Sequence, residues 1–109
     1  MKRTKVTFSE AKLNYSCDLM RALAHPLRLR ILEFIDSVGE TNVNKIYRAL
    51  NIEQSITSQH LRILRLADVV HCVRDGKMVN YTIKYDVVVR AEGALNNFLA
   101  KDKELAQRV

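Results

Sequence analysis

The sequence predicts a mainly α-helical domain with one small β-hairpin, and three observations carry this prediction. Apolar residues recur at helical spacing through residues 9–67 and again after residue 86. Between these regions, residues 69–84 hold two β-rich runs separated by Asp75-Gly76-Lys77, a turn sequence typical of hairpins. Only three glycines and one proline interrupt the 109 residues, so a single domain spanning 1–109 is expected.

Two helices are predicted before residue 38. The first covers 9–24, with Ser9 able to cap it, and its apolar stripe is Leu13, Cys17, Met20, Leu23 and Ala24. His25-Pro26 marks a boundary, because proline disfavours helical geometry in the residue before it and suits the first position of a new helix. The second helix covers 26–37 and is expected to bury Leu27, Ile31, Leu32 and Ile35. Gly39 ends it.

Two further helices follow, joined by a short turn. Thr41 or Asn42 can cap a helix over 42–50, whose inward side is Val43, Ile46, Tyr47 and Leu50. After the turn at 51–54, a fourth helix runs to about Ala67, and such a pair is a helix-turn-helix candidate. The strands are expected at Val69–Arg74 and Met78–Lys84. A last helix covers 86–103, with a stripe of Val88, Ala91, Leu95, Phe98 and Leu99.

The positive charge lies in the body of the chain. The net charge is +6 at pH 7, but four acids and four bases balance each other from residue 86 onward. The whole excess therefore sits in residues 1–85. A basic body with a neutral terminal segment favours a module that binds a polyanion such as nucleic acid.

The fourth helix separates into two sides at 100° per residue. Its core side holds Ile56, Thr57, His60, Leu61 and Leu64, whereas its outward side holds Ser55, Ser58, Gln59 and Arg62, without an acid. Glutamine can pair with adenine edges and arginine with guanine or phosphate, so this side suits a major groove. The alternative is an ordinary helix face that is exposed to solvent and contacts no DNA. From this helix, DNA contacts are expected at Gln54, Ser55, Thr57, Ser58, Gln59, His60 and Arg62.

The hairpin extends the basic surface. Arg74 and Lys77 lie in and beside its tip, where a wing touches the DNA backbone or the minor groove, and they complete the expected DNA-binding residues. A surface hairpin with incidental charge is the alternative reading. The basic arm of Lys2, Arg3 and Lys5 could add phosphate contacts or be a solvated tail.

Three blocks in order resemble the ArsR family of winged-helix repressors. Residues 23–32 resemble its opening helix junction, 54–65 its recognition helix and 70–81 its wing, and the resemblance spans about 15–105. It implies a winged helix-turn-helix, a homodimer through the first and last helices (9–24 and 86–103), a pseudo-palindromic operator and repression relieved by a signal. One departure is Glu53, where the family often carries serine as the helix cap.

Independently of the resemblance, the residues of the last helix also favour a dimer. The last helix is neutral and combines its apolar stripe with the small residues Ala91, Gly93 and Ala94. A domain of this size can hardly bury both terminal helices alone, which favours a two-fold interface over packing within one domain. Two recognition helices about one duplex turn apart would then need a two-fold related DNA site.

No metal or cofactor is expected. The resemblance would place a thiolate pair near the start of the third helix, but residues 40–45 contain no cysteine. In the last helix it would use an acid with histidines; Asp86 is present, yet Val88, Leu99 and Asp102 take the partner positions. Cys17 is expected to pack in the core, and a thiol switch between Cys17 and Cys72 is an alternative. These residues indicate no particular inducer.

Other function classes are disfavoured. The chain has no glycine-rich phosphate loop, HExxH or GxSxG motif, so an enzyme is not expected. It has no apolar run near the roughly 18 residues of a membrane span and no signal-peptide pattern, which predicts a cytoplasmic protein with no membrane partner. The predicted function is a sequence-specific DNA-binding regulator, most simply a repressor. The alternatives are a winged-helix module that binds protein without specific DNA binding, and a thiol-based redox-sensing repressor.

Overall fold

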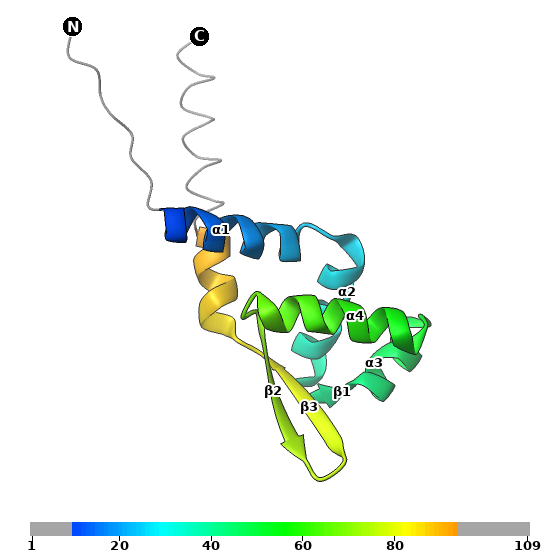
Figure 1. Ribbon diagram of the computed structural model, residues 1–109. Helices are drawn as coiled ribbons and strands as arrows, with labels where there is room; N and C mark the ends of the chain where they lie inside the picture. The colour runs from blue at the N-terminus through cyan, green and yellow to red at the C-terminus, as the bar shows by residue number, and fades with distance from the viewer. Residues whose placement is uncertain (1–9, 94–109) are drawn as a thin grey trace, which may run out of the picture.

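The computed structural model describes residues 10–93 and confirms a mainly helical domain with a hairpin wing (Figure 1). The helices are α1 (Glu10–Leu23), α2 (Pro26–Val38), α3 (Val43–Leu50), α4 (Gln54–Leu66) and a final helical segment over 85–93. The strands are β1 (Thr41–Asn42), β2 (Val70–Asp75) and β3 (Met78–Ile83). The basic arm, the Ser9 cap and the predicted helix beyond residue 93 lie outside the described residues.

The helix boundaries follow from local chemistry. His25 takes an extended conformation, and its Nδ1 accepts a hydrogen bond from the Leu27 N–H at 3.2 Å, so it caps α2 with Pro26 in the first turn. At the other end of α2, Gly39 has a φ of +86°, which glycine adopts without a Cβ clash. Its N–H donates to the Ile35 carbonyl at 2.7 Å and closes the helix. Both predicted boundaries are confirmed.

A two-residue strand that was not predicted joins the hairpin to the helices. The sheet order is β1-β3-β2, and β1 pairs antiparallel with β3 through Thr41↔Tyr81 and Asn42↔Asn80. Asn42 also caps α3, because its Oδ1 accepts from the Lys45 N–H at 3.0 Å. One short segment therefore fixes the root of the wing beside the start of α3.

The hairpin turn is tight. The register runs from Val70↔Ile83 to Asp75↔Met78, so Gly76 and Lys77 form a two-residue loop. Gly76 supplies the positive φ, +62°, that such a turn requires. The observed strands are within one residue of the predicted ones.

The core lies between the helices and the base of the sheet. Its fully or nearly buried apolar residues are Leu19, Ala22, Ile31, Leu32, Ile35, Ile46, Leu61, Leu64, Val69, Val70, Val87 and Ala91. On α2 and α3, Ile31, Leu32, Ile35 and Ile46 are buried as predicted, while Leu27, Val43, Tyr47 and Leu50 are half-buried. The prediction for α1 was wrong in part: Cys17 and Ala24 are exposed, while Leu19 and Ala22 pack inward. Ile56, assigned to the core side of α4, is also exposed.

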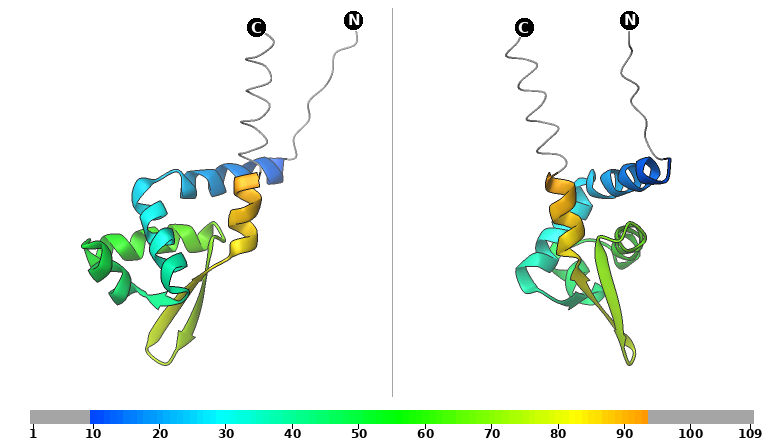
Figure 2. Two further views of the ribbon diagram at one scale, coloured as in Figure 1. Left: turned by 180° about the vertical axis from the view of Figure 1, so that it is seen from behind. Right: turned by 90° about the vertical axis from the view of Figure 1, so that its left-hand side faces the viewer.

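The physical reason for the α1 error is visible in the arrangement. α1 lies across one end of the molecule beside the 85–93 helix, and the hairpin projects from the opposite end (Figure 2). A helix at the edge of a small domain buries only a narrow strip against its own chain. Cys17 and Ala24 therefore stay exposed.

Candidate nucleic-acid interface

The turn between α3 and α4 takes three residues. Asn51 closes α3 in the left-handed conformation, with φ +55°, and the Ile52 N–H donates to the Tyr47 carbonyl at 3.1 Å. Glu53 is the N-cap of α4 but makes no side-chain capping hydrogen bond. α4 therefore begins at Gln54 without the side-chain cap that a serine would supply.

The outward side of α4 carries the predicted polar surface, called here the α4 patch: Ser55, Ser58, Gln59 and Arg62. All four residues are exposed, as is Gln54 in the first turn. Thr57, Leu61 and Leu64, on the opposite side, are fully buried. The predicted division of the helix is thus confirmed for these residues but not for Ile56, which is exposed. Contact of the patch with DNA stays a prediction.

Thr57 needs a correction. It was expected to contact DNA, but its residue surface is 0% exposed. Its Oγ1 donates to the Glu53 carbonyl at 2.9 Å, one turn earlier in the chain. A side chain so enclosed cannot reach a base edge, so Thr57 is a core residue that holds the first turn of α4.

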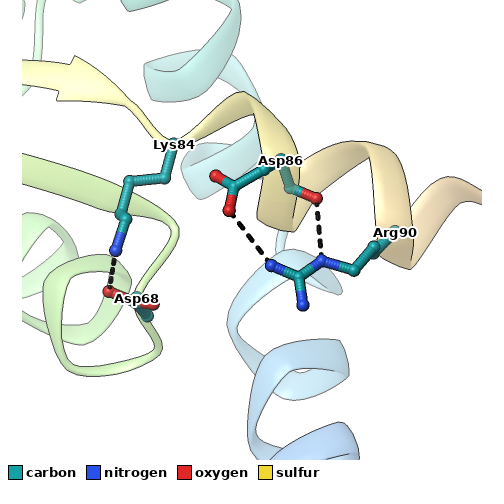
Figure 3. Close-up of polar contacts among 4 residues, drawn as sticks. All are labelled: Asp68, Lys84, Asp86 and Arg90. Atoms are coloured by element: carbon teal, nitrogen blue, oxygen red, sulfur yellow. Dashed lines mark hydrogen bonds and ion pairs between the residues drawn. The ribbon is translucent and has the colours of Figure 1, made fainter.

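The wing is fixed at its base and basic at its tip. Arg74 and Lys77 are both exposed. At the base, the Lys84 Nζ lies 2.8 Å from the Asp68 Oδ1, as Figure 3 shows beside the Asp86–Arg90 pair. The Val69 N–H also donates to the Leu64 carbonyl at 2.9 Å. The orientation of the hairpin relative to α4 is therefore set by contacts at the point where α4 ends.

Four exposed polar residues on α3 and α4 were not among the predicted DNA contacts. Lys45, Arg48 and Asn44 project from α3, and Arg65 lies on α4 one turn beyond Arg62. In helix-turn-helix proteins the first helix crosses the DNA backbone, where cations and amides bind phosphate. The same helical-wheel argument applied to the outward side of residues 43–50 would have found the α3 residues.

His60 is half-buried at the edge of the patch. Its Nδ1 accepts from the Arg28 Nε at 3.1 Å, and its ring centroid lies 4.7 Å from that of His25. Burial, then the neighbouring His25 and Arg28, lower the pKa of His60 below its ordinary value. The ring is thus engaged inside the protein, and a DNA contact by His60 stays a prediction.

Comparison with known proteins identifies the family. The family described as "Bacterial regulatory protein, arsR family" matches residues 25–71, from the α2 cap into β2. The nodulation protein NolR of Rhizobium meliloti is 31% identical over 88 residues, which cover 81% of this chain and 71% of NolR. The chain belongs to the ArsR family.

Two further comparisons agree with this family assignment. The HTH-type transcriptional regulator YgaV of Escherichia coli (strain K12) is 29% identical over 94 residues, covering 86% of this chain and 95% of YgaV. Among solved structures, the transcriptional repressor PagR of Bacillus anthracis superposes with a TM-score of 0.62 at 32% identity, covering 70% of this chain and 86% of PagR.

Membership in the ArsR family makes the chain a DNA-binding transcriptional regulator and not an enzyme. Family members bind double-stranded DNA, which agrees with the basic surface formed by α3, α4 and the wing. Within residues 10–93, no helix is both long and apolar enough to cross a bilayer.

The two cysteines are unpaired thiols in this ArsR-family chain. Cys17 is exposed, so the expectation that it packs in the core was wrong, whereas Cys72 is half-buried in β2 opposite Tyr81. Burial, followed by Cys72, raises the pKa of Tyr81. A thiol switch between the two cysteines stays a prediction.

In the part of the chain that the structure describes, no three His, Cys, Asp or Glu side chains gather as a metal site would require.

Proposed function

We propose that this ArsR-family chain is a repressor that binds a pseudo-palindromic DNA operator as a homodimer, with α4 in the major groove of each half-site. The observation that carries the proposal is the exposed, acid-free α4 patch, flanked by exposed cations on α3 and on the wing. An outward helix surface of this composition matches base edges and phosphates together.

Each group in this surface has a chemical role. Gln59 can pair with the two hydrogen-bonding atoms of an adenine edge, and Arg62 with those of guanine. The hydroxyls of Ser55 and Ser58 can bond either a base or a phosphate. Gln54 and the exposed cations Lys45, Arg48, Arg74 and Lys77 then contact the phosphate backbone on both sides of the groove.

The dimer forms through α1 and the last helix. Cys17 is exposed on α1, Ala24 is exposed directly after it, Met20 is half-buried, and Val89 on the 85–93 helix is 61% exposed. The two helices lie at the end of the molecule opposite the hairpin (Figure 2). Burying them against a second copy leaves both wings and both α4 patches available to one duplex. Such a regulator would act in the cytoplasm, on the chromosome.

Selection of the purified protein on randomised duplex DNA, at two salt concentrations, tests this proposal. We expect enrichment of a two-fold related motif whose half-sites are centred about 10 base pairs, or one helical turn, apart. Higher salt should weaken binding, because phosphate contacts release counterions. Recovery of no motif, with only weak retention that salt removes, contradicts the proposal.

One observation favours a second candidate, a winged-helix module that binds a protein partner. Ile56, Ile63 and Leu66 on α4 are exposed aliphatic residues. Ile56 and Ile63 lie roughly 80–100° around the helix from Ser55, beside the α4 patch, whereas Leu66 lies at about 20°, on the same side as the patch and one turn beyond Arg62. The selection separates the candidates, since a protein-binding module would enrich no sequence.

A further inference from the structure

Arg28 connects three helices. It lies half-buried on α2, and its Nε donates to the His60 Nδ1 of α4 at 3.1 Å. Its Nη1 donates to the Arg21 carbonyl at 3.0 Å and to the Ala22 carbonyl at 3.5 Å, both in the last turn of α1. One guanidinium therefore binds the C-terminal end of α1 and the middle of α4 together.

The chemistry at both ends suits a cation with a planar fork of donors. The last carbonyls of a helix have no partner within the helix, and the helix dipole favours positive charge there. A guanidinium can satisfy these carbonyls and still direct Nε to another acceptor, which a lysine ammonium cannot do in the same geometry.

The link lies beside a groove in the seam between α1 and α4. This groove has a volume of about 330 Å³ and is lined by Asp18, Arg21 and Ala22 of α1, by Arg28 of α2, and by Ile63, Leu66 and Ala67 at the end of α4. Because the groove is unfilled, apolar packing holds the two helices together only in part. The Arg28 hydrogen bonds supply a directional connection.

We propose that Arg28 is a positioning residue which, with neutral His60 as its acceptor, fixes the angle between α1 and α4 and so the spacing of the two α4 patches in the dimer. The inference rests on the proposed function, because the spacing matters only if two subunits bind one duplex. Arg28 itself contacts no base in this scheme.

The link depends on the protonation of His60. A nitrogen that accepts a hydrogen bond carries no proton, so neutral His60 must hold its proton on Nε2. Protonation of Nδ1 would remove the acceptor and set a cation against Arg28 and His25, the groups that face the ring from the α2 side. On α1, Asp18 pairs with Arg21 at 3.5 Å on the surface. Among the charged and titratable groups of the other elements, Lys45 and Arg48 of α3 and His71 of β2 are exposed to solvent.

The direction of the pH effect follows. The pKa of His60 is lowered by burial first and then by His25 and Arg28, so the folded protein takes up this proton at a lower pH than the unfolded chain. The link is complete above a pH of about 6.5, the ordinary histidine pKa. It is lost as the pH falls from there through the lowered pKa of the folded state.

The test compares a duplex carrying two half-sites with one carrying a single half-site, for the wild type and three variants. Arg28→Lys keeps the charge but not the fork. His60→Asn places an amide oxygen near the former Nδ1 and does not titrate. Arg30→Lys makes the same change at an exposed arginine on α2 and is the matched control.

We expect Arg28→Lys to lower affinity for the two-site duplex roughly tenfold, because the second half-site is engaged only when the spacing fits. Its affinity for the single half-site should change less than about twofold, and Arg30→Lys should match the wild type. Wild-type binding to the two-site duplex should keep its pH 7.5 value down to about pH 6.5 and weaken as the pH falls further, while binding of His60→Asn should keep its pH 7.5 value throughout.

The outcomes separate this inference from the proposed function. A wild type that does not prefer two half-sites over one contradicts both. A wild type with that preference, unchanged in Arg28→Lys and equally sensitive to pH in His60→Asn, contradicts the Arg28 role alone. Nitrogen-15 spectra of the free protein give a check without DNA. His60 should be the Nε2–H tautomer in the wild type, and a wild-type Nδ1–H tautomer would overturn the inference.

Discussion

At the scale of single residues, two adjacent positions on α4 lie in opposite environments, one buried and one exposed. Thr57 is enclosed and hydrogen-bonded to Glu53, whereas Ser58, the next residue, is exposed. The helical period predicted this division, because successive residues point about 100° apart. The sequence could not show that the Thr57 hydroxyl is satisfied by a backbone carbonyl, since that depends on how closely α4 packs.

The pair Thr57→Val and Ser58→Ala tests this assignment. Thr57→Val removes a buried hydroxyl and its hydrogen bond, so the free energy of unfolding should fall by about 1 kcal/mol. Binding of the folded variant to selected DNA should be unchanged. Ser58→Ala should show the reverse, with weaker DNA binding at equal stability. Urea denaturation and binding isotherms on both variants give the answer, and a Thr57→Val protein that is stable but binds DNA poorly would restore Thr57 as a contact residue.

At the scale of elements, the sequence predicted the periodic segments and missed the short one. The helices and the two hairpin strands carry repeating apolar patterns, and His25-Pro26, Gly39 and Gly76 mark their ends. β1 has two residues, too few for a pattern, and its partners Tyr81 and Asn80 lie far along the chain. Such a strand exists only because the hairpin returns beside α3. A pattern within a short stretch of sequence cannot predict this pairing.

The wing should bind DNA through charge and not through sequence. Lys77→Ala removes the cation from the two-residue loop at the hairpin tip. We expect affinity to fall by a similar factor on selected and scrambled duplexes, and the slope of log affinity against log salt to decrease by about one. Titrations at several salt concentrations measure this slope. Lys77→Arg, which keeps the charge, is the control, and a loss confined to the selected duplex would show that the wing reads bases.

At the scale of the whole molecule, the α1 error is informative. The stripe predicted for the first helix, which included Cys17 and Ala24, does not coincide with the side that is buried. Leu19 and Ala22 pack on their own domain, and Cys17 and Ala24 face outward. A single sequence carries no mark that separates a buried stripe from an interface stripe. The order of the elements and the patch on α4 were predictable, but which residues of α1 stay exposed was not.

The exposed valine on the last helix tests the dimer. Val89→Lys places a charge on the proposed interface, and in a two-fold dimer each copy would bury it. We expect the dimer to dissociate at least about tenfold more readily, with the thermal stability of the subunit little changed. Val38→Lys, at a similarly exposed valine at the end of α2, is the matched control. Sedimentation equilibrium compares them, and equal dimer affinity in both variants would place the interface elsewhere.

The central claim is that the α4 patch reads base sequence, and the direct test is the affinity of Arg62→Ala for DNA. Isotherms are measured on the selected duplex and on duplexes with one base pair changed, with Arg30→Ala as the control for lost charge. We predict that Arg62→Ala weakens binding to the selected duplex by about 1–3 kcal/mol and abolishes discrimination at one position of each half-site. Unchanged binding, or an equal loss on every duplex, would contradict the claim.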